Sequence, residues 1–282
     1  MVEGADANYR YLTVGRTILD ALNKRLAGSK PAVAKPVALP ASSIDGRNLL
    51  SGLDYESRLT RKEYHHKLEK YQGRLNLLTR DKKFRKKSMI IVFEGADAAG
   101  KGGSIRRITG ALDARYYRVT PVAAPTEEER AQPYLWRFWR SLPRRGRVTI
   151  FDRSWYGRVL VERVEKLCSE EDWMRAYHEI NDFEEQMVEA NGIVTKFWLT
   201  ITKDEQLRRF QEREKTPFKS FKITPEDWRN RRKWDAYERA VCDMIECTGN
   251  DAAPWVLVPA NDKYSARIAI RKRLCERIEE AL

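Results

Sequence analysis

A phosphate-binding loop is predicted where the apolar segment SMIIVF (88–93) leads into EGADAAGKGGS (94–104) and then into the helical pattern SIRRITGAL. Glycines let successive backbone N–H groups converge on an anion, and the start of a helix adds positive potential. A strand, the spacing G-x-x-x-x-G-K and a helix in this order are what such a loop requires. Lys101 would reach the phosphates. The other expected phosphate-binding positions of the loop are Gly95, Ala98, Ala99, Gly100, Gly102, Gly103 and Ser104.

The residue after the lysine departs from the ordinary form of this loop, because Gly102 stands where Ser or Thr usually binds magnesium. Magnesium prefers oxygen ligands and is usually held by one or two carboxylates together with substrate phosphates. Asp97 lies inside the loop and Asp152 ends the apolar segment RVTIF, so both are candidate ligands of Mg²⁺, with Mn²⁺ as an alternative ion. The alternatives are a turn-stabilising role for Asp97 and a helix-capping role for Asp152.

Short apolar segments alternate with helical patterns along the rest of the chain. We expect strands at 88–93, 118–121, 147–152, 193–201 and 254–260. Apolar strands alternating with helices predict a parallel sheet covered on both faces. The predicted fold class is therefore α/β. The expected architecture is a three-layer P-loop kinase fold, with a five-stranded parallel sheet, helices on both faces and a helical lid.

The N-terminal part is expected to be separate from this fold. The segment AGSKPAVAKPVALPASSIDGR, which begins at residue 27, is rich in Ala, Pro and Ser, and predicts a linker over 27–56. Residues 2–26 align without a gap with residues 258–282, so that Leu12 meets Ile268 and Ile18 meets Leu274. Either two amphipathic helices share a generic pattern, or residues 1–26 are the tail of a preceding, similar domain.

The formal net charge of +13 favours polyanionic partners such as nucleic acid, an acidic membrane surface, nucleotides or inorganic polyphosphate. The strongly basic end of the helical pattern 55–87 fits either a solvated helix terminus or such an attraction. No helix-turn-helix or RNA-binding signature and no apolar run of about 18 residues is present, so we expect neither a nucleic-acid nor a membrane partner. The four cysteines form no C-x-x-C pair, which favours reduced, structural thiols and a cytoplasmic location.

The segments FEGADAAGKGG and FDRSWYGRVLVERV together resemble the polyphosphate kinase 2 family. Further matches follow in order: APTEEE (124–129), RFWRSLP (137–143), EQLRRFQER (205–213), KWDAYERAVCDMIECT (233–248) and APWVLVPANDKYSAR (253–267). The resemblance covers about residues 57–282. It implies a phosphotransferase that moves phosphate between inorganic polyphosphate and nucleotides. In this family Asp stands in the loop and Gly follows the lysine, so the resemblance implies that Asp97 and Asp152 hold the metal.

The resemblance also gives roles to basic residues. Lys101, Arg153 and Arg209 are expected to offset charge on the transferred group, forming the catalytic set with the two aspartates. Further expected phosphate- or nucleotide-binding positions are Arg137, Arg158, Arg213 and Lys222. Surface ion pairs or packed aliphatic stems are alternatives for Arg137, Arg153 and Arg158. The segment at about 204–232 resembles the lid of nucleotide kinases, and a solvated amphipathic surface helix is its alternative.

The residues that follow Asp152 indicate which nucleotide accepts the phosphoryl group. YGRVLVERV resembles the branch that phosphorylates nucleoside monophosphates, whereas the diphosphate branch typically has YNRAGVE, with Asn in place of Gly157. The resemblance therefore implies that AMP is converted to ADP. Phosphorylation of ADP or GDP to the triphosphate is the alternative, and an ATP-using nucleotide kinase is a rival interpretation.

The aromatic residues after the expected lid are Trp228, Trp234 and Tyr237. Their spacing favours core packing over a nucleobase site. We also expect the protein to form a homo-oligomer.

Overall fold

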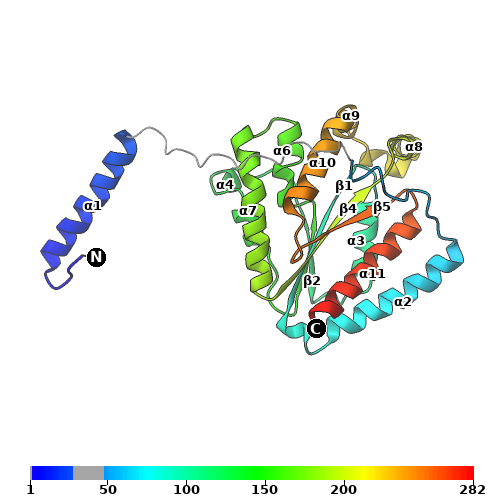
Figure 1. Ribbon diagram of the computed structural model, residues 1–282, viewed down its shortest axis with the longest axis horizontal. Helices are drawn as coiled ribbons and strands as arrows, with labels where there is room; N and C mark the ends of the chain where they lie inside the picture. The colour runs from blue at the N-terminus through cyan, green and yellow to red at the C-terminus, as the bar shows by residue number, and fades with distance from the viewer. Residues whose placement is uncertain (1, 28–47) are drawn as a thin grey trace. The chain divides into compact units, whose positions relative to one another are not determined.

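The computed structural model describes residues 2–27 and 48–282. Contacts divide the chain into two compact units, Met1–Val37 and Ala38–Leu282. The described part of the first unit contains one helix, α1 (Ala7–Ala27). All the described strands belong to the second unit (Figure 1).

The second unit alternates strands and helices along the chain. Its elements are α2 (Arg61–Arg80), η1 (Phe84–Lys86), β1 (Ser88–Gly95), α3 (Lys101–Thr109), β2 (Tyr117–Pro121), α4 (Glu127–Arg130), α5 (Trp136–Trp139), β3 (Val148–Asp152), η2 (Trp155–Arg158), α6 (Val161–Val164), α7 (Glu170–Glu189), β4 (Gly192–Thr200), α8 (Lys203–Glu214), η3 (Pro217–Lys222), α9 (Pro225–Arg232), α10 (Trp234–Thr248), β5 (Trp255–Pro259) and α11 (Lys263–Ala281).

The strands form one parallel sheet in the order β2-β3-β1-β4-β5. The predicted five-stranded parallel sheet is therefore confirmed. After β1 the chain forms β2 and β3 on one side of β1 within the sheet. It then crosses to form β4 and β5 on the other side, so β1 is the central strand. In the register of the ladder, Phe93 of β1 pairs with Asp152 of β3 on one side and with Phe197 of β4 on the other. Ligands of open α/β sheets bind outside the carboxyl ends of the strands at such a switch point.

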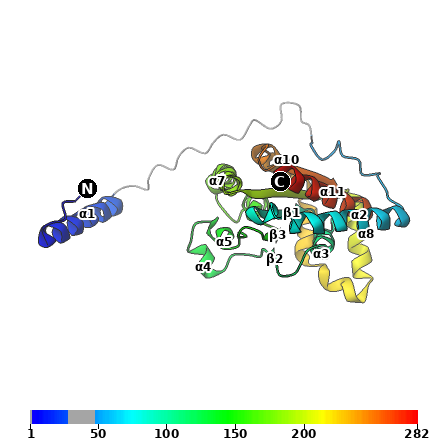
Figure 2. The same ribbon diagram turned by 90° about the horizontal axis from the view of Figure 1, so that it is seen from below.

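Helices bury both faces of the sheet. Successive side chains of β1 point to opposite faces, so the strand contributes to both cores. Met89 and Ile91 pack with residues of α2, α3 and α11, whereas Ile90 and Val92 pack with residues of η2, α7 and α10. Figure 1 shows α7 and α10 on one side of the sheet and α2 and α11 on the other, and Figure 2 shows the same layers from below. The predicted three-layer α/β fold is confirmed.

Helix α1 and helix α11 share a sequence pattern and use it differently. Leu12 and Ile18 of α1 are 66% and 55% exposed, whereas the residues aligned with them in α11, Ile268 and Leu274, are buried in the core. The apolar stripe that closes the sheet in α11 thus lies uncovered within the described part of the first unit. The assignment of residues 1–26 to a preceding domain stays a prediction.

Most of the expected linker, residues 28–47, lies outside the described residues. Its described end belongs to the second unit: Leu50 is buried in the core, and the Tyr55 hydroxyl lies 3.2 Å from Thr200 Oγ1 at the end of β4. None of the described helices combines the length and apolarity needed to cross a lipid bilayer.

Candidate active site

The predicted phosphate loop forms a tight turn between β1 and α3. Gly95 has φ +150°, and a Cβ there would lie 2.4 Å from the carbonyl oxygen of Leu199, so only glycine fits where the loop leaves the sheet. Ala98 (φ 62°) and Gly100 (φ 109°) adopt left-handed conformations that turn the chain toward the start of α3. Lys101 folds back over the loop, and its Nζ donates to the carbonyl oxygen of Gly95 at 2.6 Å.

A cleft of about 500 Å³ opens beside this loop, and we call it the phosphate cleft. Its lining comprises residues 96–103 of the loop and α3, residues 121–123 after β2, Asp152, Arg153, Arg213, Lys222 and Asp227. The structure therefore brings together most of the residues that the sequence assigns to phosphate binding. They come from the ends of β1, β2 and β3 and from the segment α8–η3–α9, where we expect the lid.

The two aspartates expected to bind metal line the same cleft. Asp152 ends β3, and among the described residues its carboxylate makes no hydrogen bond or ion pair. Asp97 Oδ2 accepts a hydrogen bond from Asn230 Nδ2 at 2.9 Å, and Asp97 Oδ1 lies 4.0 Å from a guanidinium nitrogen of Arg153. The described residues hold no cluster of three or more His, Cys, Asp or Glu side chains that could bind a metal. Two carboxylates in a phosphate-binding cleft fit a hard divalent cation that takes its other ligands from substrate phosphates and water.

A second cavity also borders the loop, and we call it the apolar pocket. It is lined by Leu50, Glu94, Gly95, Ala96, Asp97, Lys101, Arg153, Gly157, Leu160, Val161, Trp198, Thr200, Gln206, Glu226, Asn230, Trp234, Tyr237, Glu238 and Val241. Ala96, Asp97, Lys101 and Arg153 line both cavities and form a shared wall between them. A ligand in one cavity can therefore meet a ligand in the other at these side chains.

Sequence reasoning did not anticipate the aromatic residues of this pocket. Trp234 and Tyr237 line it, although their spacing favoured core packing. Trp228 does pack inward, with its ring 5.1 Å from that of Phe210. The available signal was the three-residue spacing of Trp234 and Tyr237 next to the expected lid. Leu50 could not have been found, because it comes from a segment expected to be linker.

Glu94 is a further residue that the sequence analysis missed. It lies at the end of the apolar strand β1, is 5% exposed, and accepts a hydrogen bond from Ser154 Oγ at 2.8 Å. Burial raises the pKa of the Glu94 carboxyl, and the Ser154 hydrogen bond, Lys101 and Arg153 act against that rise. A carboxyl at the end of an otherwise apolar strand, directly before the loop glycine, was the signal available in the sequence.

The profile of the polyphosphate kinase 2 family matches residues 58–282 of the chain. The chain belongs to the polyphosphate kinase 2 family. A Pseudomonas aeruginosa relative named polyphosphate:AMP phosphotransferase is 58% identical over all of this chain and 57% of its own length. A second relative from that organism, named ADP-polyphosphate phosphotransferase, is 38% identical over 76% of this chain and 71% of its own length.

A solved Pseudomonas aeruginosa structure described as a polyphosphate kinase 2 superposes on this chain with a TM-score of 0.89 at 56% identity. The alignment covers 99% of this chain and 58% of the solved one. The chain thus spans a little over half the length of the solved protein and of the 58% identical relative.

Membership of the family explains why glycine follows the loop lysine, because the resemblance to polyphosphate kinase 2 proteins includes this glycine.

Two of the arginines expected to bind phosphate have partners elsewhere in this polyphosphate kinase 2 fold. Arg158 Nε lies 2.9 Å from Glu162 Oε2, and its guanidinium lies over the ring of Tyr134. Arg137 donates to the carbonyl oxygen of Ala123 at 3.0 Å and to Glu129 Oε2 at 3.3 Å. Neither lines the phosphate cleft, because each guanidinium is held by a neighbouring carboxylate. Arg213 and Lys222, by contrast, both line it.

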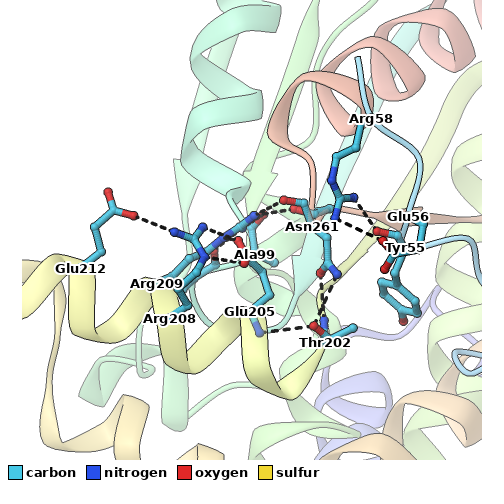
Figure 3. A network of polar contacts seen from close by, with 12 residues as sticks. Tyr55, Glu56, Arg58, Ala99, Thr202, Glu205, Arg208, Arg209, Glu212 and Asn261 are labelled. Carbon is cyan, nitrogen blue, oxygen red and sulfur yellow. Dashed lines mark hydrogen bonds and ion pairs between the residues drawn. The ribbon is translucent and has the colours of Figure 1, made fainter. Parts of the chain in front are cut away.

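Arg209 lies beneath the phosphate loop and is 3% exposed. Its guanidinium donates to the carbonyl oxygens of Ala98 (2.9 Å), Ala99 (3.3 Å), Ala260 (2.6 Å) and Asn261 (2.9 Å), and to Glu205 Oε1 (2.6 Å). Figure 3 shows the guanidinium between the loop and Asn261, which follows β5. These contacts join the loop after β1 to the residues that follow β5, two strands away. This is a positioning arrangement rather than the expected contact with the transferred group.

Arg209→Lys should therefore disturb the loop without removing positive charge. Lysine has three donors and no planar fork, so it cannot serve both pairs of carbonyls. We expect turnover to fall about tenfold, corresponding to about 1.4 kcal/mol of lost positioning, with a lower Tm. Steady-state kinetics and thermal unfolding check this, with Arg208→Lys on the exposed side of α8 as the control. Wild-type stability combined with a pure loss of turnover would instead favour direct contact with the transferred phosphoryl group.

Proposed function

We propose that this chain carries a phosphotransferase site that moves a phosphoryl group from inorganic polyphosphate to a nucleotide, with AMP as acceptor and ADP as product. The observation that carries the proposal is the shared wall of Ala96, Asp97, Lys101 and Arg153 between the phosphate cleft and the apolar pocket. One cavity has the chemistry of a polyanion site and the other that of a nucleoside site. Membership of the polyphosphate kinase 2 family supports the same assignment.

The donor is assigned to the phosphate cleft. Its lining includes the glycine-rich loop and the first turn of α3, and backbone N–H groups in such a loop and at a helix start favour anions. Lys101, Arg153, Arg213 and Lys222 add positive charge around it. A chain of phosphates can use all of these groups at once, and the +13 net charge of the chain attracts such a polyanion.

The acceptor is assigned to the apolar pocket. Trp198, Trp234 and Leu160 offer the apolar and aromatic contacts that a nucleobase and ribose require. Asn230 and Gln206 add amide groups for polar contacts. The acceptor phosphate would then point toward the shared wall, where the donor chain ends.

Magnesium is assigned to Asp97 and Asp152, with Mn²⁺ as the alternative. Their oxygen donors fit a hard divalent cation, and the carboxylate of Asp152, which has no partner within residues 48–282, supports this choice. When bound, the cation would neutralise charge on the phosphates and help to align them. Asn230 holds the Asp97 carboxylate from α9, so the expected lid and the metal-binding residue are linked.

The chemistry needs little covalent participation by the protein. A phosphate oxygen of AMP forms a bond to the terminal phosphorus of polyphosphate, and the bridging P–O bond breaks with its electrons remaining on the shortened chain. Lys101 and Arg153 lie on the shared wall and offset the charge that moves across it. Positioning and charge neutralisation are the main contributions expected for phosphoryl transfer.

The preference for AMP should appear in initial rates measured with polyphosphate, magnesium and either AMP or ADP. We expect a specificity constant about tenfold higher for AMP, the size of a 1.4 kcal/mol difference. Gly157 lines the apolar pocket, and the nearest atom to a Cβ built there is Val161 Cγ1 at 3.9 Å. Gly157→Asn, which introduces the residue typical of the diphosphate branch, should therefore fold and shift the ratio toward ADP.

A higher specificity constant for ADP or GDP would establish the alternative, phosphorylation of a diphosphate to the triphosphate. Rates with ATP in place of polyphosphate test the rival nucleotide-kinase function.

The location that we propose is the cytoplasm. The four cysteines are all free thiols, which supports this location: Cys168, Cys242, Cys247 and Cys275. Assembly into a homo-oligomer stays a prediction.

A further inference from the structure

A second group of arginines lies behind the phosphate loop, between α2, α3 and α11. These three helices lie side by side on one face of the sheet (Figure 2). Between them an open cavity of about 370 Å³ is lined by Leu68, Gln72, Arg106, Arg107, Gly110 and Arg271. Half of the lining residues are arginines and none is acidic, so we call it the arginine cavity.

Arg271 is the unusual member of this cavity. It is 1% exposed, and its Nε and Nη2 have no hydrogen-bond partner among the described residues. Its Nη1 donates only to the carbonyl oxygen of Arg267, at 3.3 Å. Burial lowers the pKa of Arg271, the nearby Tyr64 opposes this fall, and the charges of Arg107 and Arg267 add to it, so that the pKa lies at about 10. A buried charge without a partner is destabilising, so an anionic ligand would relieve a defect of the free protein.

The neighbours of Arg271 do not supply the missing negative charge. Within residues 48–282, no ion pair involves Arg106, Arg107, Arg267 or Arg271. Arg107 Nε donates to the Tyr64 hydroxyl at 2.9 Å, a neutral oxygen. Buried charges in proteins are ordinarily paired or bind an ion.

Helix α3 contributes to the lining of both the phosphate cleft and the arginine cavity. Gly102 and Gly103 line the cleft, and Arg106 and Arg107 follow them at four-residue spacing on the same faces of α3. Arg107 Nη1 donates to the carbonyl oxygen of Gly103 at 2.9 Å, and an Nη2 of Arg267 lies 3.3 Å from the position of a Cβ on Gly103. The first turn of α3, without side chains at two positions, thus connects the two basic regions.

We propose that the arginine cavity is a second phosphate-binding site, which holds a distal segment of the polyphosphate chain whose terminal phosphate lies in the phosphate cleft. The identity of the ligand rests on the proposed function, whereas the anion site itself rests on the unpaired arginines. Guanidinium groups bind phosphate oxygens through paired N–H donors. The site would favour long chains over short ones, because only a long chain can span both regions.

The test compares tripolyphosphate with long-chain polyphosphate as phosphoryl donors to AMP. The two variants are Arg106→Gln and Arg271→Met. Arg106 is exposed, so its substitution should not affect folding. The control is Arg239→Gln, an exposed arginine on α10 at the opposite face of the sheet. We expect each cavity variant to raise the KM for the long chain about tenfold, as loss of a charge-assisted contact does. Turnover at saturation, and the KM for tripolyphosphate and AMP, should match the control.

Thermal unfolding gives a second readout that does not depend on catalysis. Without polyphosphate, Arg271→Met should raise the Tm, because it removes an unpaired buried charge. Long-chain polyphosphate should then stabilise this variant less than the wild type. A fall in Tm with an unchanged long-chain KM would show that Arg271 has a structural role and would overturn the proposal.

Two further results would also overturn it. An equal rise in KM for short and long donors would place the effect in the phosphate cleft, and a change in sedimentation of Arg106→Gln would indicate that a carboxylate of a second copy fills the cavity. If the wild type transfers no phosphoryl group from either donor, the proposed function fails. The difference in Tm shift between wild type and Arg271→Met then still decides whether the cavity binds a phosphate chain.

Discussion

Asp152→Asn should lower the turnover of AMP phosphorylation by about 10²–10³-fold while the protein remains folded. The carboxylate of Asp152 lines the phosphate cleft without a partner among the described residues, so its charge supports no contact of the fold. Asparagine keeps the shape and removes the anionic oxygen that a divalent cation requires. Loss of one strong electrostatic contribution to a transition state commonly has this size.

The measurement is turnover with polyphosphate and AMP over a range of magnesium concentrations, with thermal unfolding beside it. Asp97→Asn should behave similarly, although its contact with Asn230 would also change. Asp235→Asn, in an exposed position at the start of α10, is the matched control. Near-normal turnover of Asp152→Asn at limiting magnesium would rule out Asp152 as the metal ligand.

Lys196→Met should lower the free energy of unfolding by about 3–5 kcal/mol, the usual cost of removing one partner of a buried ion pair. Lys196 of β4 and Glu184 of α7 are completely buried, with Nζ 2.7 Å from Oε2. Glu184 also accepts from Trp155 Nε1 at 3.0 Å and from the Tyr156 hydroxyl at 2.7 Å. Without Lys196, the carboxylate would remain in the core without a counter-charge.

Urea unfolding of Lys196→Met, Glu184→Gln and the double variant would check this. The double variant should be less destabilised than the sum of the two single changes, because it leaves no unpaired charge. Burial raises the pKa of Glu184 and lowers that of Lys196, and their mutual attraction opposes both shifts. Strictly additive free energies would show that the two side chains do not depend on each other.

This buried pair also has a consequence for the site. Trp155 and Tyr156 form the start of η2, directly after Asp152, Arg153 and Ser154. Their hydrogen bonds to Glu184 anchor the segment that carries Arg153 into the shared wall. The single variants should therefore lower turnover as well as stability, even though neither side chain touches a substrate.

The sheet could be predicted from the sequence because each strand is a short apolar run with a helical pattern on both sides. The weakest of them, at 118–121, is also found in the structure, as an edge strand whose side chains are largely exposed. That position explains why its pattern was faint. The loop could be predicted for a different reason: its glycines and lysine have a fixed spacing that depends only on local geometry.

The direction of individual side chains could not be predicted in the same way. Helical spacing places Arg209 and Arg213 on one face of α8, yet Arg209 turns under the loop and Arg213 lines the cleft. The carbonyl oxygens that accept from Arg209 include that of Ala260, about fifty residues further along the chain. Likewise, Arg158 pairs with Glu162, four residues further along the chain. Only the folded structure shows that Arg158 contacts this carboxylate and not the phosphate cleft.

The wall shared by the phosphate cleft and the apolar pocket has a stereochemical consequence. In the proposed function, donor and acceptor would occupy their own cavities together, so the phosphorus atom would move only from one oxygen to the next across Lys101 and Arg153. No phosphorylated side chain is required as a stage between them. A single in-line displacement of this kind inverts the configuration at phosphorus, whereas two successive displacements through the protein would retain it.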